Sequence, residues 1–292
     1  MKQSNMTGRI IRGVGGIYYV AAGGSTYECS ARGRFRKAKI TPTVGDFVKF
    51  TVIDEQNKKG ALDTIEERKN LLIRPRAANI DTAIITFAAA SPNINMDLLD
   101  RFLLLAETQK IPNIIICINK SDLAGDEARR DFSRIYGNIY PIAYVSAEKG
   151  MGIDILKGLI KGVTVFAGPS GVGKSSLINA LIPESNRQTG EISRKIERGK
   201  HTTRQVELLS MDKDTYIVDS PGFTSLSLDF LQHSDIQNYF REFVPYLGQC
   251  RFVDCAHIAE PDCAVKAHIG EGISQERYDR FVSLYNELKQ RR

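Results

Sequence analysis

The chain has 292 residues, of which 42% are hydrophobic and 25% are charged. At roughly 100–200 residues per domain, this length predicts two or three domains. Its net charge of +6 favours nucleic acid or another polyanion as a partner. Residues 1–9 are polar, and no apolar run approaches the roughly 18 residues that a membrane-spanning helix needs. We therefore expect a cytoplasmic protein with no membrane partner.

The first 72 residues have the pattern of short strands separated by turns. Candidate strands cover residues 8–11, 17–21, 25–30 and 46–53, and glycine pairs such as Gly15-Gly16 separate them. About five strands in about 60 residues predict a small β-barrel such as an OB-fold. Strand propensity alone would also fit another small barrel.

Residues 73–228 have a different pattern, in which strands alternate with helices. Predicted strands at residues 80–88, 114–118, 141–145 and 163–167 are followed by predicted helices at residues 97–109, 126–136, 152–160 and 174–181. This alternation predicts a parallel sheet covered on both faces. Residues 206–211 and 215–219 predict a hairpin added to that sheet.

A phosphate-binding motif occupies the last of these strand-to-helix turns. The sequence Gly168-Pro169-Ser170-Gly171-Val172-Gly173-Lys174-Ser175 matches G-x-x-x-x-G-K-[ST] in full. Its glycines let backbone N–H groups face the phosphates, and the following helix N-terminus favours negative charge. We expect Lys174 to reach the β- and γ-phosphates and Ser175 to ligate Mg²⁺. A chance glycine-rich turn is the alternative, and the strand before and the helix after it disfavour that reading.

The base is predicted to be guanine because of Asn119-Lys120-Ser121-Asp122, which follows the predicted strand 114–118. The Asp122 carboxylate can accept hydrogen bonds from guanine N1–H and the 2-amino group, whereas adenine would leave it unpaired. Ser146-Ala147 has the form of the loop that supports guanine O6, although the dipeptide alone is nearly uninformative. A polar loop at a strand end is the alternative for Asn119–Asp122.

Two further segments are expected to respond to the γ-phosphate. Asp219-Ser220-Pro221-Gly222 is a D-x-x-G motif, in which Asp219 can hold Mg²⁺ through water and Gly222 can donate its N–H to the γ-phosphate. Upstream lies Lys200-His201-Thr202-Thr203, where one threonine would close over Mg²⁺. The sequence does not decide between Thr202 and Thr203, and a plain polar loop is the alternative.

Catalysis is predicted to depend on Lys174, His201, Thr202 and Thr203. Phe223 follows the D-x-x-G motif where Ras-like enzymes carry a water-positioning glutamine, and phenylalanine cannot orient water by hydrogen bonding. Unassisted turnover should therefore be slow. His201 could position the water instead, or it could simply pack or bind RNA.

Three of the five cysteines cluster near the C-terminus with a histidine. Cys250, Cys255, His257 and Cys263 form the pattern C-x₄-C-x-H-x₅-C, whose three thiolates and one imidazole suit a closed, structural Zn²⁺ site. Buried cysteines in a helical core are the alternative, and we prefer that reading for Cys117. His268 is a rival ligand that more simply caps or packs.

Two basic clusters suggest contact with RNA. The first lies in a loop-like stretch of the barrel domain beside Phe35, and the second lies between the P-loop helix and the D-x-x-G motif. Their members are Arg32, Arg34, Arg36, Lys37 and Lys39 in the first, and Arg194, Lys195, Arg198, Lys200 and Arg204 in the second. Such cations give salt-sensitive affinity for phosphates, although a solvated basic face is the alternative for each.

The order of the nucleotide motifs is unusual, because the base-reading residues precede the P-loop. Chain ends often lie close together, so a circular permutation can keep the same packed sheet. In these motifs the chain resembles the ribosome small subunit-dependent GTPase A family of circularly permuted bacterial GTPases. The resemblance covers nearly the whole chain, including residues 119–122, 168–176, 199–203, 219–222 and the cysteine/histidine block.

The resemblance implies an OB-fold at residues 1–72, a permuted GTPase domain at 73–228 and a zinc-binding helical domain at 229–292. It adds Ser176 to the nucleotide-binding residues. It also implies a monomeric enzyme that binds GTP, GDP and the small ribosomal subunit with its rRNA, and that assists late subunit maturation with subunit-stimulated turnover.

Two other functions remain as alternatives. An RNA-binding chaperone could hold GTP only as a structural ligand, and measurement of subunit-stimulated turnover would separate the two. A metabolic P-loop kinase is disfavoured by residues 119–122 and by the lack of an evident acceptor site in the sequence.

Overall fold

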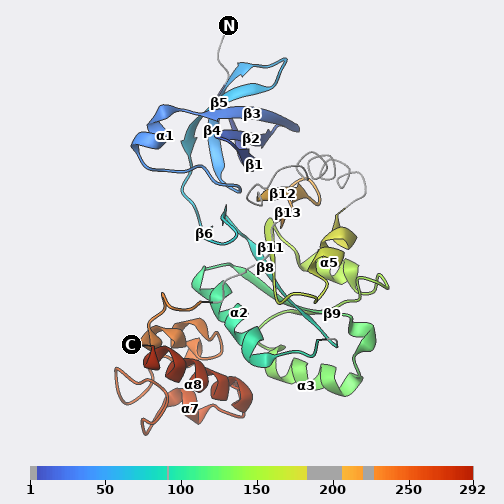
Figure 1. Ribbon diagram of the computed structural model, residues 1–292. Coiled ribbons are helices and arrows are strands. Elements are labelled where there is room, and N and C mark those ends of the chain that lie inside the picture. The colour runs from blue at the N-terminus through green and yellow to red at the C-terminus, as the bar shows by residue number, and fades with distance from the viewer. Residues whose placement is uncertain (1–4, 91, 183–205, 220–226, 292) are drawn as a thin grey trace.

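The computed structural model describes residues 5–90, 92–182, 206–219 and 227–291 of the chain. A β-barrel lies at one end, an α/β domain lies in the middle, and the C-terminal residues pack beside helix α2 of that domain (Figure 1). Among the described residues, no helix has both the length and the apolar character that crossing a bilayer requires.

The barrel has five strands, as the sequence predicts. They are β1 Asn5–Val14, β2 Ile17–Ala22, β3 Ser25–Ala31, β4 Phe47–Asp54 and β5 Lys59–Ile65. The strand order is β1-β2-β3-β5-β4, and β1 also pairs with β4, which closes an OB-like barrel. Strand β1 is longer than predicted because its first half pairs with β4 and its second half pairs with β2.

The basic stretch after β3 is not a loop throughout, which corrects the sequence-based expectation. Residues Gly33–Lys37 form the short helix α1, in which the Ala38 N–H donates to the Arg34 carbonyl oxygen over 2.9 Å. Phe35 is buried and holds this turn against the barrel core. The stretch therefore has a fixed backbone turn beneath its charged side chains.

The α/β domain is built on a mostly parallel sheet with the order β10-β9-β8-β11-β13-β12. Its strands are β8 Thr82–Ala88, β9 Asn113–Asn119, β10 Ile142–Tyr144, β11 Val163–Ala167, β12 Glu207–Ser210 and β13 Tyr216–Asp219. Only β12 runs antiparallel, because it forms the predicted hairpin with β13. The structure therefore confirms both the parallel sheet and the added hairpin.

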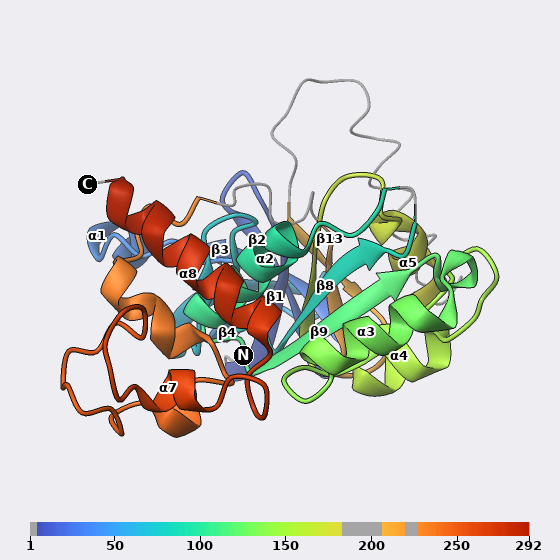
Figure 2. The same ribbon diagram turned by 90° about the horizontal axis from the view of Figure 1, so that it is seen from below.

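Helices cover both faces of this sheet. They are α2 Met96–Thr108, α3 Asp126–Tyr136, α4 Ile153–Leu159 and α5 Lys174–Leu181, with the single turn η1 Ser121–Leu123 after β9. Alternate residues of β8 face opposite sides: Ile84 packs with the side chains of α4 and α5, whereas Ile85 packs with those of α2. Figure 2 shows the helices on the two sides of the strands.

The barrel is attached to the α/β domain by close backbone packing around Gly45. A Cβ atom at this residue, whose φ is +93°, would lie 2.0 Å from the Ala78 carbonyl oxygen. The Asn79 side-chain amide donates to the Gly45 carbonyl over 3.1 Å. Ala78 belongs to a two-stranded ribbon of β6 Leu71–Leu72 and β7 Ala77–Ala78. Only glycine fits this junction without moving the backbone.

The C-terminal residues are less regular than a helical domain suggests. They form the 3₁₀ helices η2 His233–Tyr239 and η3 Val244–Tyr246, the short helix α7 Ala264–Ala267 and the longer helix α8 Gln275–Gln290. Three rings from these segments, those of Phe240, Phe243 and Phe281, are fully buried and pack edge to face or tilted. They form the local core around which the irregular segments fold.

A buried charge network joins this region to the α/β domain. Asp100 of α2 is 1% exposed, and its carboxylate lies 2.6 Å from Arg277 Nη1 and 2.5 Å from Arg280 Nε. It also accepts a hydrogen bond from the Tyr136 hydroxyl over 2.8 Å. Arg277 Nε in turn lies 2.6 Å from Glu242. Several bonds on each charge offset the cost of removing these groups from water.

We predict that Arg277→Ala lowers the unfolding free energy by about 3–5 kcal/mol, because it leaves Glu242 buried without its cation and removes one of the two cations at Asp100. The measurement is the urea midpoint of the full chain. The matched control is Arg134→Ala, which breaks the exposed pair between Arg134 and Glu276 and should leave the midpoint almost unchanged. Equal midpoints for the two variants would contradict the prediction.

Candidate active site

The predicted nucleotide-binding segments meet at one edge of the sheet. Strands β8, β9, β10, β11 and β13 are parallel, so their carboxyl ends lie together. Residues 119–122 follow β9, residues 146–147 follow β10, the P-loop follows β11, and Asp219 ends β13. Ligands of open α/β sheets bind at this edge.

Asn119 connects three of these segments through one side chain. Its Nδ2 donates to the Val172 carbonyl oxygen of the P-loop over 2.8 Å, and its Oδ1 accepts from the Ala147 N–H over 3.1 Å. The residue is 3% exposed, so both bonds are shielded from water. Sequence reasoning placed Asn119 among the guanine-binding residues but missed that it holds the P-loop against both base-reading segments.

The residues after Asn119 turn sharply, which exposes the carboxylate of Asp122, the predicted base-reading residue. Lys120 has a left-handed backbone conformation with φ of 56°, and Ser121 is buried and donates its N–H to the Val145 carbonyl over 2.9 Å. Asp122 then lies exposed in η1. The carboxylate is therefore held by a fixed turn and remains accessible to a ligand.

The Ser146-Ala147 segment is a closed turn. Ser146 and Met151 exchange two backbone hydrogen bonds of 3.0 and 3.1 Å, and the Ser146 hydroxyl accepts from the Lys149 N–H over 3.3 Å. Ser146 is 1% exposed. This turn and the Asn119 bond together fix the Ala147 N–H.

The P-loop has glycine where the backbone comes close to its neighbours. Gly168 has φ of +136°, and a Cβ there would lie 2.0 Å from the Thr86 carbonyl oxygen. Gly173 has φ of +90°, and a Cβ there would lie 2.3 Å from Asn119 Nδ2. Neither position accepts a side chain, since the β8 backbone and the Asn119 bridge fill that space.

Lys174 begins α5 and folds back over the loop. Its Nζ donates to the carbonyl oxygens of Gly168 and Pro169 over 2.8 and 2.6 Å. Burial lowers the pKa of this ammonium group from its ordinary value. An anionic phosphate would favour the charged form again. The next two residues, Ser175 and Ser176, are exposed at the start of the helix, so this donor set fits a nucleotide phosphate with its Mg²⁺.

Several predicted residues cannot be placed. His201, Thr202 and Thr203 lie outside the described residues, as do Ser220, Pro221 and Gly222 of the D-x-x-G motif. Asp219 is described and ends β13. The roles assigned to the others remain predictions.

The predicted metal ligands come together in the C-terminal region. The ligand atoms of Cys250, Cys255, His257 and Cys263 all lie within 4.8 Å of one another. His257 Nδ1 lies 3.5 Å from Cys250 Sγ and 3.3 Å from Cys263 Sγ, so this ring nitrogen faces the thiols. Three of the four residues are buried, and a closed set of sulfur and nitrogen donors fits a structural metal.

The remaining candidate ligands lie elsewhere. His268 Nδ1 lies 2.8 Å from the Ala264 carbonyl oxygen, and its ring stacks on Tyr246 with centroids 4.0 Å apart. It caps and packs, as expected. Cys117 is fully buried in β9, and Cys29 is fully buried in the barrel core. Burial raises the pKa of the Cys29 thiol to about 12, so both cysteines belong to the hydrophobic core.

The chain has a small barrel followed by a P-loop domain. In that domain the predicted base-reading turn precedes the P-loop in the sequence, which is the motif order of a circularly permuted GTPase. Residues 65–229 match the RsgA GTPase family, and residues 7–62 match the RsgA N-terminal domain. The chain belongs to the RsgA GTPase family and is a GTP hydrolase.

Curated relatives and solved structures match over nearly the whole chain. The chain is 46% identical over 288 residues to the small ribosomal subunit biogenesis GTPase RsgA of Alkaliphilus metalliredigens, covering 98% of each chain. It is 47% identical over 300 residues to the RsgA of Agathobacter rectalis, covering 98% of this chain and 99% of the relative.

Two solved structures share the whole architecture. YjeQ from Thermotoga maritima has a TM-score of 0.85 at 34% identity, with 99% of this chain and 100% of that chain covered. YloQ, described as a circularly permuted GTPase, has a TM-score of 0.82 at 36% identity, with 99% and 96% covered.

We predict that Asp122→Asn weakens GTP binding by at least about tenfold, because it removes a charged hydrogen-bond acceptor for guanine. The variant should instead favour xanthine nucleotides, whose 2-oxo group suits an amide donor. Titration of both nucleotides measures this. The control is Asp126→Asn, an exposed carboxylate in the first turn of α3. Unchanged GTP affinity in Asp122→Asn would remove this residue from the site.

Proposed function

We propose that the protein is a small ribosomal subunit biogenesis GTPase that binds the subunit, assists its late maturation and hydrolyses GTP faster on it. The observation that carries the proposal is the Asn119 bridge between P-loop and base-reading turns, in a chain whose curated relatives carry that name. The nucleotide site would let the protein change state between GTP and GDP. The barrel and the C-terminal region, which flank the GTPase domain, would supply surface for a large partner.

The proposed roles in hydrolysis follow from where the residues lie. Asp122 reads the guanine edge, and the Ser146-Ala147 turn is held in place by the bond from the Ala147 N–H to Asn119. Lys174 leaves the P-loop carbonyls to contact the β- and γ-phosphates. Mg²⁺, when bound with GTP, neutralises charge on the phosphates. Ser175 and Asp219 are the residues that would hold it, together with Thr202 or Thr203.

Water activation is assigned to His201, since Phe223 follows the D-x-x-G motif. A phenylalanine at this position leaves the attacking water without an oriented hydrogen-bond acceptor. Turnover by the free protein is therefore slow, and binding of the subunit is the event that brings His201 into use.

The cysteine/histidine cluster is proposed to hold one Zn²⁺ as a structural ion. The Cys263 side chain accepts hydrogen bonds from the Lys266 N–H, and Cys250 accepts from the Ala264 N–H, over 3.5 and 3.3 Å. Backbone donors of this kind stabilise thiolates that also bind a metal. The ion would brace segments that contain little regular structure.

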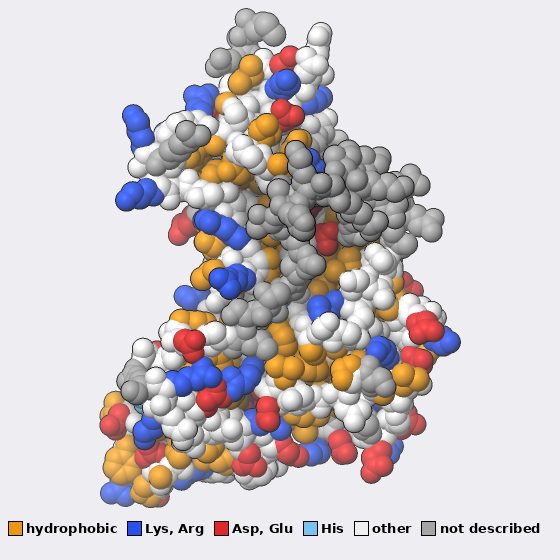
Figure 3. All heavy atoms as spheres, in the orientation of Figure 1, with side chains coloured by type: hydrophobic (Ala, Val, Ile, Leu, Met, Phe, Trp, Pro, Cys, Tyr) orange, Lys and Arg blue, Asp and Glu red, His pale blue; other side chains and the backbone are white. Residues whose placement is uncertain are grey.

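RNA contact by the barrel is supported by a hollow of about 460 Å³ that is lined in part by Tyr18, Phe35, Arg32 and Lys39. Rings and cations in one hollow suit a nucleic acid. Figure 3 shows Lys and Arg side chains along the flank of the barrel and the recess below it. Arg32 and Arg34 also pair with Asp63, at 3.0 and 3.5 Å, and both remain exposed, as do Lys37 and Lys39.

We predict that purified small subunits raise the GTP turnover number of the full chain, whereas large subunits do not. The measurement is phosphate release at saturating GTP and fixed salt, because phosphate-directed binding is salt-dependent. Tight subunit binding without any acceleration would favour the alternative function, an RNA chaperone for which GTP is a structural ligand.

We predict about one zinc per chain by elemental analysis, and a lower content in Cys255→Ala. That variant should lose order in residues 229–292 while GTP affinity is largely kept, because the cluster lies in a different region from the P-loop. His268→Ala is the matched control, since His268 bonds a backbone carbonyl, and it should keep its zinc. A metal-free native protein would end the zinc assignment.

A further inference from the structure

The β12–β13 hairpin occupies the boundary between the barrel and the GTPase sheet (Figure 1). On one side Tyr216 of β13 pairs with Val163 of β11, and on the other side Glu207 of β12 pairs with Arg12 of β1. Strand β13 ends at Asp219, the first residue of the D-x-x-G motif, and β12 begins a few residues after Thr203. Both ends of the hairpin therefore lead into segments that are expected to respond to the γ-phosphate.

The barrel contacts this hairpin through an arginine held between two rings. The Arg9 guanidinium carbon lies 4.1 Å from the ring centroid of Phe47 in β4 and 5.7 Å from that of Tyr216 in β13. Its Nη1 atom is buried and has no hydrogen-bond partner among the described residues. Burial lowers the pKa of this group, and the nearby carboxylates of Asp81 and Asp214 oppose that shift. Arg9 is thus a half-buried cation held by aromatic faces, and it has no ion pair with another residue that the structure describes.

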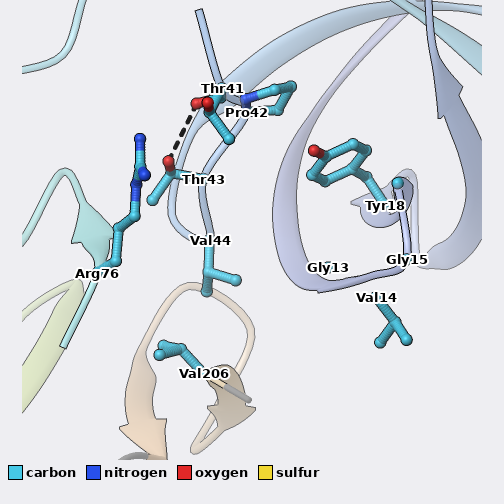
Figure 4. A pocket seen from close by; sticks show the side chains of 11 residues that line it. Gly13, Val14, Gly15, Tyr18, Thr41, Pro42, Thr43, Val44, Arg76 and Val206 are labelled. Carbon is cyan, nitrogen blue, oxygen red and sulfur yellow. Dashed lines mark hydrogen bonds between the residues drawn. The ribbon is translucent and has the colours of Figure 1, made fainter. Parts of the chain in front are cut away.

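A pocket between the barrel and the hairpin lies at the start of the hairpin. Val206, which directly precedes β12, lines a pocket with Val14 and Val44 of the barrel domain, and Arg76 forms another wall (Figure 4). The barrel contacts the hairpin near the end that leads to Thr203, where Arg12 pairs with Glu207, and also at Tyr216, three residues before Asp219.

We propose that Arg9 is a positioning residue for GTP hydrolysis, which holds the β12–β13 hairpin, and through it Asp219, in a position set by the barrel. This inference rests on the proposed function in one respect, namely that the partner that moves the barrel is the RNA of the small subunit. Arg9 itself touches neither nucleotide nor metal, and acts through Tyr216.

The contact between Arg9 and the two aromatic rings can persist while the hairpin shifts relative to the barrel. An ion pair with a carboxylate would fix the guanidinium by directed hydrogen bonds. A ring face attracts a cation over a range of lateral positions, so the hairpin can shift while the contact persists.

The first test uses the full chain without ribosomes. Hydrogen exchange of the β1 amides, residues 5–14, is compared with GDP and with a non-hydrolysable GTP analogue bound. We expect a nucleotide-dependent difference in the wild type that disappears in Arg9→Met, which keeps an apolar stem without the cation. Tyr216→Leu should abolish the difference, whereas Tyr216→Phe, which keeps the ring, should retain it. Identical exchange in both nucleotide states of the wild type would overturn the inference, as would a difference that survives Arg9→Met.

The second test measures turnover on small subunits. Arg9→Met should keep the subunit affinity of the wild type but lose at least about fivefold of the subunit-stimulated turnover number, which is the low end of typical coupling between two sites. The double variant of Arg9→Met with Tyr216→Leu should be no slower than either single variant, because both changes break one contact.

The outcomes separate the two proposals. If Arg9→Met lowers subunit affinity and turnover in parallel, Arg9 is a subunit contact and the positioning role is wrong. If subunits fail to accelerate the wild type, the proposed function fails, while the exchange experiment still decides whether Arg9 couples the barrel to the hairpin.

Discussion

The candidate nucleotide site is held together by one buried amide, that of Asn119. Its two hydrogen bonds join segments that are far apart in the sequence, at Val172 and Ala147. Because the amide group both donates and accepts, it can satisfy a carbonyl on one side and an N–H on the other. This bridge requires only that three strand ends lie side by side. The bridge does not depend on the order of these segments in the sequence, so it is compatible with a circularly permuted order of the motifs.

Elements with strong local signals were predicted closely from the sequence. The bounds of α3, β11 and α5 agree with the predicted ranges residue for residue, because strand periodicity, acidic first turns and the glycine-rich turn are all encoded within a few positions. The metal ligands were found for the same reason, since they fall within 14 residues of one another in sequence, from Cys250 to Cys263.

Interactions between distant residues could not be predicted in this way. Asp100 and Arg280 are separated by 180 positions, and nothing near either residue signals the contact. The contact of Arg9 with the Tyr216 ring likewise joins residues far apart in the sequence, and nothing near either residue signals it. The sequence also did not predict the tight turns around the cysteine cluster, which have positive φ at His257 and Asp262. The short helix at Phe35 was missed because burial of one ring decides it.

The network around Asp100 has a consequence for how the protein is made. Asp100 and Tyr136 belong to the central domain, yet their cationic partners Arg277 and Arg280 are on the last helix. During synthesis the central domain leaves the translating ribosome with this carboxylate still in water. Its helix α2 reaches the native environment only when α8, which begins at Gln275, has also emerged. A chain truncated near its end should therefore stay recognisable to quality-control proteases, and only finished copies would assemble the fully packed enzyme.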